Sequence, residues 1–384
     1  MKIACITTSQ MPTSSAHSIQ AVKVCQALAQ IGHTVKLWIP GSHQTPSEQS
    51  QCFNQEWDTF SNHYGLSTPF EVEWVPCSSS LRRYDFAWKS VRRALTWGAD
   101  LVYTWTPQAA VLALMLGAPT IIELHDMPSG RFGPWLFRLF LKHNGKKRLL
   151  VTTDGLRRKL EAAYHVSLQS PETQIAPNGT ELERYNDLPD PPTARKNLDL
   201  PERPTVVYSG HFYAGRGMDL LLELAHAFPQ VTFLWIGGRP NDLAPWKEQL
   251  EQSKLHNVVM TGFIENSRLP LYQAAADVLL MPYSSKVSGS SGGNIVDVFN
   301  PMKMFDYLAT GRAILSSDLP VLHEVLNTGN TVFCPPDDLP AWQTALSALL
   351  ADPTRGQRLG AQAHLDARLY TWRRREENAL EGFA

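Results

Sequence analysis

The residues around position 303 combine a cation, an acid and a helix start. A Gly/Ser-rich stretch at 288–294 leads into Asn-Pro-Met-Lys at 300–303, and a run with helical spacing follows. A proline suits the first turn of a helix, and the free N–H groups of a helix start favour an anion. Lys303 adds a positive charge there, and Asp306 lies one turn later, where it could accept hydrogen bonds from a sugar diol. The alternative is an ordinary helix with a surface Lys–Asp pair.

A second cluster of residues that could bind a ligand lies at 209–217, with the sequence Ser-Gly-His-Phe-Tyr-Ala-Gly-Arg-Gly. It follows a strand-like run and precedes a helical one. Glycines on both sides of Arg216 let the backbone approach a ligand while the guanidinium pairs with phosphate. The alternative is a tight turn that carries a solvated arginine.

Two further candidates lie in the first half of the chain. His125 ends a strand-like run, a position suited to proton transfer or hydrogen bonding in an α/β protein, although a single histidine is more often structural. The first strand-to-helix loop, 10–18, is rich in hydroxyl residues and lacks the GxGxxG pattern, which disfavours a nicotinamide or flavin dinucleotide site.

Alternating strands and helices must position these residues. The runs that predict strands in the first half are 2–8, 34–39, 101–105, 120–124 and 148–152. Those in the second half are 205–208, 232–236, 258–261, 278–281 and 313–316. Strand–helix alternation with short turns predicts an α/β protein with parallel sheets, which bind ligands at the carboxyl ends of their strands.

Two proline-rich stretches, 186–193 and 200–204, separate the two alternations and predict a linker. The expected division is an N-terminal Rossmann-like domain at 1–185, a linker at 186–204, a C-terminal domain at 205–365 and an arginine-rich helix at 366–384. That last helix could cross back to the first domain.

Composition excludes several classes of protein. The chain has 384 residues, 43% of them hydrophobic, which suits two folded domains rather than disorder. Its 35 basic and 36 acidic residues give a net charge of -1, so no global field attracts nucleic acid. No apolar run is long enough to span a membrane, and the N-terminus does not resemble a signal peptide. The cysteines are scattered without a CxxC pair, which favours free thiols in a reducing cytoplasm: Cys5, Cys25, Cys52, Cys77 and Cys334.

Several of these segments together resemble the large retaining family 4 of glycosyltransferases with the GT-B fold, over nearly the whole chain. The segment 301–311 is similar to that family's donor helix, P-x-K-x-x-E-Y-x-A-x-G. The other segments that carry the resemblance are 15–20 with 32–35, the strand-end 123–126, the "pNG" turn 176–180, and 317–325. The implied fold is two Rossmann-like domains that face each other across a cleft.

The resemblance also implies roles for individual residues. It places a donor nucleotide sugar mainly on the second domain, and an acceptor on the first. The implied contacts are Arg216, Lys303 and His211 to the donor diphosphate; Asp306 to the ribose; the backbone of Asn300, Pro301 and Met302 to phosphate and sugar; Gly262 and Phe263 to the base; His125 to the donor sugar; and Ser14, Ser15, His17 and Ser18 to the acceptor.

Three positions depart from the family pattern. Asp306 stands where the family has a longer Glu, and His211 stands where many members have another basic residue. Val298 occupies the position of a second acid that contacts the donor hexose, although Asp297 is adjacent. These departures bear on the identity of the donor sugar and on activity.

The resemblance implies a retaining hexosyltransferase that acts from a nucleoside-diphosphate sugar on a hydroxyl acceptor, in polysaccharide or glycoconjugate biosynthesis. The leaving diphosphate would help to take the acceptor proton, while Arg216, Lys303 and the helix start neutralise charge. We therefore expect neither a metal nor a cofactor, and no DxD cluster is present. The alternatives are a non-catalytic sugar-nucleotide-binding partner subunit and a sugar-nucleotide epimerase on the same fold.

The acceptor is the least specified element. Segment 132–148 combines an apolar helical pattern with a basic end, which could rest on an anionic membrane and serve a lipid-linked acceptor. The expected location is then the cytoplasm, with peripheral contact at the inner membrane face. The alternative is a helix packed on its own domain.

Overall fold

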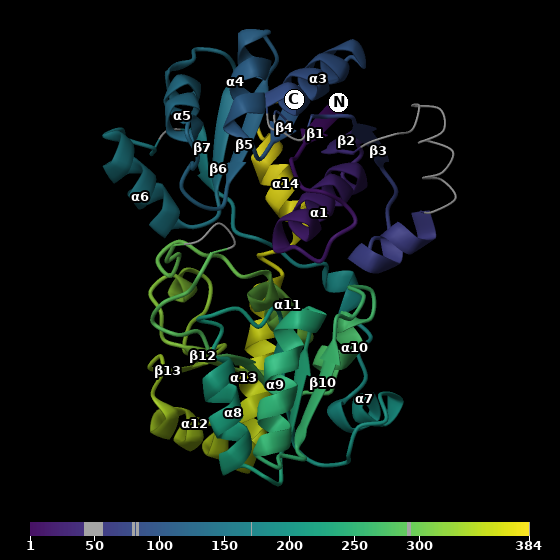
Figure 1. Ribbon diagram of the computed structural model, residues 1–384, viewed down its shortest axis with the longest axis vertical. Helices are drawn as coiled ribbons and strands as arrows, with labels where there is room; N and C mark the ends of the chain where they lie inside the picture. The colour runs from purple at the N-terminus through teal and green to yellow at the C-terminus, as the bar shows by residue number, and fades with distance from the viewer. Residues whose placement is uncertain (42–56, 79–80, 82–83, 170, 290–292, 384) are drawn as a thin grey trace. The chain divides into compact units, whose positions relative to one another are not determined.

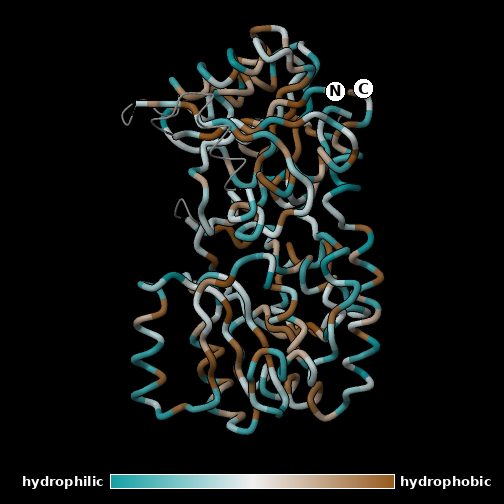
Figure 2. Tube along the Cα trace, turned by 90° about the vertical axis from the view of Figure 1, so that its right-hand side faces the viewer, coloured by the Kyte–Doolittle hydropathy of each residue, from teal (hydrophilic) through white to brown (hydrophobic). Residues whose placement is uncertain are grey.

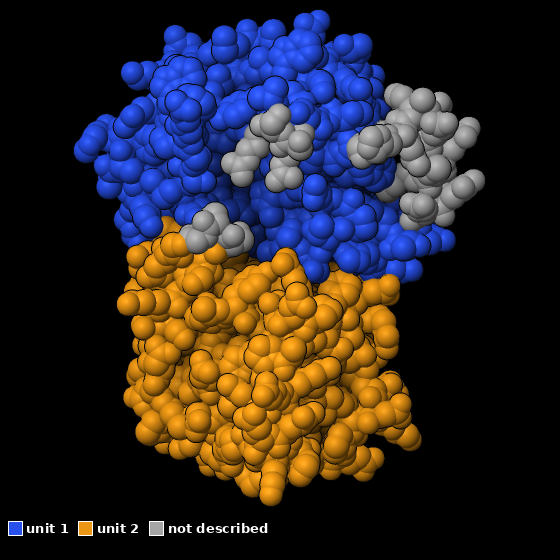
Figure 3. Space-filling view, viewed as in Figure 1, with its two compact units in different colours: residues 1–178, 372–384 blue, residues 179–371 orange. Residues whose placement is uncertain are grey.

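The computed structural model describes residues 1–41, 57–78, 81, 84–169, 171–289 and 293–383. Cys52 and part of the 288–294 stretch lie outside these residues. The chain forms two compact units, one of residues 1–178 together with 372–384 and one of residues 179–371 (Figure 3).

The first unit contains a parallel sheet in the order β3-β2-β1-β4-β5-β6-β7, counted over the described residues (Figure 1). Its strands are β1 Lys2–Ile6, β2 Thr34–Pro40, β3 Glu71–Val75, β4 Leu101–Thr104, β5 Thr120–Leu124, β6 Lys147–Val151 and β7 Thr173–Ile175. Its helices include α1 Ala16–Gln30, α3 Tyr84–Thr96, α4 Pro107–Met115, α5 Gly133–Lys142, α6 Asp154–Tyr164 and α14 Trp372–Leu380.

The second unit contains a parallel sheet in the order β10-β9-β8-β11-β12-β13. Its strands are β8 Thr205–Ser209, β9 Thr232–Ile236, β10 Val258–Gly262, β11 Val278–Met281, β12 Ala313–Ser317 and β13 Val332–Cys334. Its helices are η1 Leu182–Arg184, α7 Pro191–Asn197, α8 Met218–Ala227, α9 Pro240–Gln252, α10 Leu269–Ala274, α11 Met302–Thr310, η2 Leu322–Glu324, α12 Leu339–Ala351 and α13 Pro353–Ala367. The predicted α/β fold with two parallel sheets is confirmed.

Continuous apolar runs form the central strands because helices cover both faces of a parallel sheet. Every residue of β5, β8, β9, β11 and β12 is buried. Figure 2 shows hydrophobic stretches of the chain in the interior of each unit. Among the described residues of the first sheet, the order reverses between β1 and β4, and in the second sheet it reverses between β8 and β11. Loops that leave strands at such points line the ligand crevice of open α/β sheets.

The division between the units differs from the expected linker. The boundary falls at 178/179, and segment 186–204 belongs to the second unit. Part of that segment forms α7, which begins after the N-cap Asp190 with prolines in its first turn. Arg195 of α7 bonds Asp277 at 2.9 Å, so this proline-rich stretch is anchored rather than extended. Helix α14 belongs to the first unit, although it follows the second in sequence.

Candidate functional site

Lys303 lies at the second position of α11, and its ammonium group is buried without a hydrogen-bond partner among the described residues. The Nζ atom is 3.7 Å from the ring centroid of Tyr208 and 5.5 Å from that of Tyr283. Burial, and then the nearby Arg216, hold the pKa of Lys303 well below its ordinary value. A cation that is desolvated and has no hydrogen-bonding or anionic partner costs free energy, and an anionic ligand would relieve that cost.

Arg216 is the second cation of this cluster. Its guanidinium carbon is 5.3 Å from the ring centroid of Tyr283, which Lys303 also faces. Loop 209–217 follows β8 at the reversal point of the second sheet, so the fold brings the two predicted phosphate ligands together. Two like charges beside one aromatic ring repel each other, and a diphosphate would bridge them.

The glycines of loop 209–217 serve packing as much as ligand approach. Gly217 has φ +74°, and a Cβ atom there would lie 1.6 Å from the carbonyl oxygen of Pro282. A Cβ atom at Gly210 would lie 2.9 Å from the Lys303 ammonium nitrogen. The loop therefore needs glycine to pack on the segment after β11 and to admit Lys303. His211, from the same loop, stacks on Tyr213 with ring centroids 4.8 Å apart.

Asp306 lies one turn beyond Lys303 and is engaged within its own unit. The hydroxyl group of Thr180 donates a hydrogen bond to its Oδ1 at 3.2 Å. The buried Tyr185 hydroxyl also bonds this carboxylate, which helps to raise the pKa of Tyr185, after the larger effect of burial. The turn at 176–180 and the helix at 301–311, which the sequence analysis treated separately, therefore meet at Asp306.

The predicted backbone contacts lie at element ends. Pro301 is the N-cap of α11 rather than a residue of its first turn, so the helix begins one residue later than expected. Gly262 ends β10 with φ +70°, and its carbonyl accepts a hydrogen bond from the Gly237 N–H at 2.9 Å. The Phe263 side chain is 47% exposed, so its ring is open to solvent.

Val298 is fully buried, whereas Asp297 is exposed. The fold therefore treats the position of the family's second acid as a core position, which agrees with the apolar residue found there. The adjacent acid, Asp297, is exposed to solvent.

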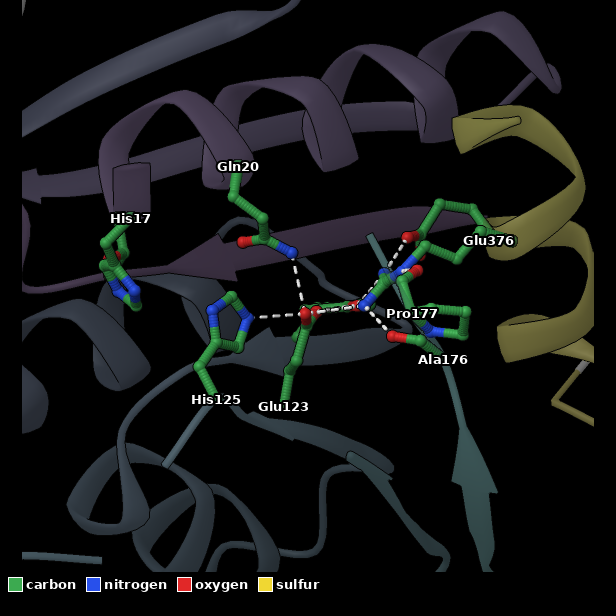
Figure 4. A network of polar contacts seen from close by, with 10 residues as sticks. His17, Gln20, Glu123, His125, Ala176, Pro177 and Glu376 are labelled. Atoms are coloured by element: carbon green, nitrogen blue, oxygen red, sulfur yellow. Dashed lines mark hydrogen bonds and ion pairs between the residues drawn. The ribbon is translucent and has the colours of Figure 1, made fainter. Parts of the chain in front are cut away.

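In the first unit, His125 directly follows β5 and its side chain is 28% exposed. Its Nε2 atom lies 2.7 Å from the Oε1 atom of the fully buried Glu123 (Figure 4). Burial alone would raise the pKa of Glu123, but the Arg375 guanidinium and the His125 hydrogen bond bring it to about 2. The carboxylate is thus ionised and can only accept, so the Nε2 atom of His125 carries a proton.

His17 lies beside His125, with ring centroids 5.6 Å apart. Its pKa is lowered to about 4 because burial disfavours the imidazolium and His125 adds a smaller effect. The serines of the same loop have structural partners. Ser15 is the N-cap of α1 and accepts from the Ser18 N–H, and the buried Ser18 hydroxyl donates to the Thr13 carbonyl at 2.9 Å. Ser14 is partly buried.

Segment 132–148 divides between the core and the surface. Phe137 and Phe140 of α5 are buried, whereas Phe132 and Trp135 are 45% and 56% exposed. Its basic end is partly engaged, because Arg148 donates to the carbonyls of Ala379 and Glu381 at 2.7 Å each. The packed-helix alternative therefore holds for one face of α5.

Sequence reasoning assigned no role to Glu123 or Arg375. Arg375 lies in an arginine-rich helix, where a charge run usually indicates solvent exposure. A signal was present, however, because the buried positions of α14 follow helical spacing: Trp372, Arg375, Glu376, Ala379 and Leu380. The apolar members of that stripe place Arg375 and Glu376 on the buried face.

No helix within the described residues has both the length and the apolar character needed to cross a membrane. Nor do three or more His, Cys, Asp or Glu side chains of the described residues group so as to hold a metal ion. The expectation that the chain needs no metal or cofactor stays a prediction.

The fold corresponds to a known class of protein. The structure is similar to a glycosyltransferase from Rickettsia africae, with a TM-score of 0.75 and 13% identity over 100% of this chain and 98% of that one. It is also similar to Anabaena HepE in complex with UDP and glucose, with a TM-score of 0.72 and 16% identity over the full length of both. These likenesses show the fold, which is GT-B.

The sequence comparisons define the family. Residues 18–184 match the model described as Glycosyltransferase Family 4, and residues 203–352 match that described as Glycosyl transferases group 1. The chain belongs to the family 4 glycosyltransferases, as its motifs predicted.

Two curated relatives illustrate the range of the family. A GDP-mannose-dependent phosphatidylinositol monomannoside mannosyltransferase of Mycolicibacterium smegmatis is 27% identical over 73% of this chain and 76% of its own length. A D-inositol 3-phosphate glycosyltransferase of Xylanimonas cellulosilytica is 25% identical over 72% of this chain but 64% of its own length.

Proposed function

We propose that the chain transfers a hexosyl group from a nucleoside-diphosphate sugar to a hydroxyl acceptor, with retention of configuration. One observation carries the proposal: the buried ammonium of Lys303 has no hydrogen-bond partner among the described residues and lies with Arg216 on the Tyr283 ring. This pair of cations at a helix start suits a diphosphate.

The proposed donor contacts follow the family resemblance. Arg216, Lys303 and His211 bind the diphosphate, and Asp306 binds the ribose. The backbone around Pro301 meets the phosphate and sugar, and that of Gly262 and Phe263 meets the base. His125 contacts the sugar, and the loop that carries His17 meets the acceptor.

Charge neutralisation is the main chemical task that these residues can perform. Loss of the sugar leaves negative charge on the diphosphate, and fixed cations stabilise that charge as it develops. The acceptor oxygen bonds the anomeric carbon as the bond from that carbon to the diphosphate breaks, and a leaving phosphate oxygen takes the hydroxyl proton. The protein therefore supplies neither the nucleophile nor the base. This mechanism requires no metal.

A donor panel tests the proposal. Relatives and structural neighbours carry GDP-mannose, UDP and glucose in their names, so the panel is UDP-glucose, UDP-galactose, GDP-mannose and ADP-glucose. Release of nucleoside diphosphate from one donor, increased by a hydroxyl acceptor, supports a transferase. An altered sugar with its diphosphate intact would indicate an epimerase, and binding without chemistry would indicate a partner subunit.

Asp306→Asn should weaken the binding of UDP and reduce the preference of the protein for UDP over 2′-deoxy-UDP. A carboxylate that accepts from the ribose diol loses a charge-assisted bond, worth roughly 1.5–3 kcal/mol, when it becomes an amide. Titration calorimetry with UDP and 2′-deoxy-UDP measures both affinities. If the wild type and the variant have the same ratio of UDP affinity to 2′-deoxy-UDP affinity, Asp306 does not bind the ribose 2′-hydroxyl group.

At pH values above the lowered pKa of Lys303, binding of UDP should be accompanied by proton uptake at this residue. Burial lowers its pKa in the free protein, and a bound diphosphate raises it again. Affinity should therefore fall as pH rises above the lowered pKa, because more of the free protein must then gain a proton to bind. Calorimetry in buffers of different ionisation enthalpy measures the uptake. The Lys303→Met variant should lack it, and equal uptake in both proteins would contradict the assignment.

We further propose a lipid-linked acceptor at an anionic membrane surface. Phe132 and Trp135 are exposed at α5, the Arg131 guanidinium lies over the Phe132 ring, and Tyr84 of α3 contacts that ring. Aromatic side chains with adjacent cations favour an anionic bilayer interface. The curated relatives include enzymes whose names specify phosphatidylinositol and diacylglycerol acceptors.

The Phe132→Ala/Trp135→Ala double variant should bind phosphatidylglycerol vesicles several-fold more weakly than the wild type, because less apolar surface enters the interface. Vesicle co-sedimentation measures the change. Leu369→Ala removes a side chain that is 55% exposed in the other unit and should have no effect. Equal binding by the double variant and the wild type would assign the exposed aromatics another role.

A further inference from the structure

The carboxylate of Glu123 is the centre of a buried network in the first unit. Its Oε1 atom accepts from Gln20 and His125 at 2.7 Å each, and from Arg375 at 2.5 Å. Its Oε2 atom accepts from the Tyr103 hydroxyl at 2.6 Å. Figure 4 shows these groups converging from α1, β5 and α14. Four donors leave this carboxylate little freedom to move.

Arg375 uses all of its N–H groups within the same network. Its Nε donates to the Pro177 carbonyl at 2.9 Å. One terminal nitrogen donates to Glu123 and to the Ala176 carbonyl, and the other donates to the Tyr103 hydroxyl and to Glu376. A guanidinium has five N–H donors, so its hydrogen-bonding capacity is filled. The Arg375 side chain is 4% exposed.

A contribution to the stability of the fold is a weak reason for burying the Glu123–Arg375 ion pair. A buried ion pair typically gains little over apolar residues of the same size, because both charges lose their hydration. The network has one member that is both chemically active and partly open to solvent, the His125 ring, with its side chain 28% exposed. Burying these charges therefore fixes the orientation of one imidazole.

We propose that Arg375 and Glu123 are positioning residues for His125, with Arg375 of the C-terminal helix acting through the Glu123 carboxylate. This inference rests on the proposed role of His125 at the donor sugar. Because Nε2–H is donated to Glu123, Nδ1 is the ring nitrogen that is left to form a hydrogen bond with a sugar hydroxyl group. A ring that could rotate or exchange tautomers would hold the sugar less well.

A pair of isosteric variants tests the first step. Glu123→Gln and Glu376→Gln each remove one carboxylate that bonds Arg375, but only Glu123 bonds His125. In protein labelled with ¹⁵N-histidine, we expect a protected downfield Nε2–H signal from His125, assigned by its loss in His125→Asn. Glu123→Gln should shift this signal upfield and speed its exchange, because a neutral acceptor bonds more weakly. Glu376→Gln should leave it in place.

Turnover tests the second step, with UDP-glucose and GDP-mannose as the donors. Glu123→Gln should lower kcat roughly tenfold, the scale of a charge-assisted contact, with UDP and GDP affinity unchanged. Arg375→Lys should also lower kcat in the wild-type background and have little further effect in the Glu123→Gln background, because coupled residues are not additive. Circular dichroism and the melting temperature confirm that each variant is folded.

Either of two results would overturn the inference. One is an identical effect of Glu123→Gln and Glu376→Gln on the His125 N–H signal. The other is additive losses of kcat in the Arg375→Lys/Glu123→Gln double variant. If the wild type turns over none of the four donors of the panel, the proposed function fails, but the N–H signal still decides whether Glu123 and Arg375 position the ring.

Discussion

We expect His125→Ala to lower kcat about 100-fold, the scale of losing one positioned polar group in the transition state, while UDP and GDP affinity should stay within about threefold. The residues proposed for the nucleotide, Arg216, Lys303 and Asp306, all belong to the unit of residues 179–371, whereas His125 belongs to the other unit. An interaction made only with the reacting sugar changes turnover and leaves ground-state nucleotide binding intact. Initial rates with UDP-glucose and GDP-mannose, together with calorimetry, measure both quantities.

A second histidine provides the control for that result. His226 is exposed on α8, and His226→Ala should leave both kcat and affinity unchanged. Normal turnover in His125→Ala would make His125 a structural residue. A joint loss of turnover and nucleotide affinity would instead indicate a damaged fold, which the melting temperature would reveal.

Lys303→Met should weaken UDP binding by about 10- to 100-fold and at the same time raise the melting temperature of the free protein. A charge-assisted contact to phosphate is worth roughly 1.5–3 kcal/mol, which sets the loss of affinity. The rise in stability follows because the ammonium is buried without a hydrogen-bond partner among the described residues, and methionine removes that desolvation cost. Calorimetry and thermal unfolding measure the two changes.

The opposite signs of these two effects distinguish a ligand site from a structural lysine. Lys247→Met, at an exposed position on α9, should change neither quantity appreciably. Arg216→Ala should also weaken UDP binding, by about tenfold or more. A Lys303→Met variant that is less stable and binds UDP normally would show that the lysine supports the fold instead.

The sequence was sufficient for the central strands of both sheets, because continuous apolar runs between helical segments have few other structures available. It missed β3, β7 and β13, which lie at sheet edges. Strand β3 alternates glutamate with apolar residues, and β7 and β13 have three residues each, so none has the apolar run of a central strand. It also treated the prolines near 190 as a linker, whereas they start α7.

The candidate site was predictable to the extent that it lies in local motifs. Lys303 and Arg216 follow a helix start and a strand end, and the order of strands in the second sheet brings them to the same tyrosine. The link from Arg375 to Glu123 spans 252 positions of sequence. Such a pair depends on tertiary packing, which buries two charged residues of the arginine-rich helix α14, Arg375 and Glu376. No local sequence pattern specifies that Glu123 is the partner of Arg375.

Calorimetric titration of the wild type and Lys303→Met with matched nucleotides tests the central claim, that the cation pair binds the diphosphate of a sugar nucleotide. The titrants are UDP with uridine, GDP with guanosine and ADP with adenosine. We predict that one diphosphate binds the wild type at least 100-fold more tightly than its nucleoside, and that Lys303→Met loses most of that difference. Equal affinity for nucleoside and diphosphate, or a diphosphate preference that survives in Lys303→Met, would contradict the account.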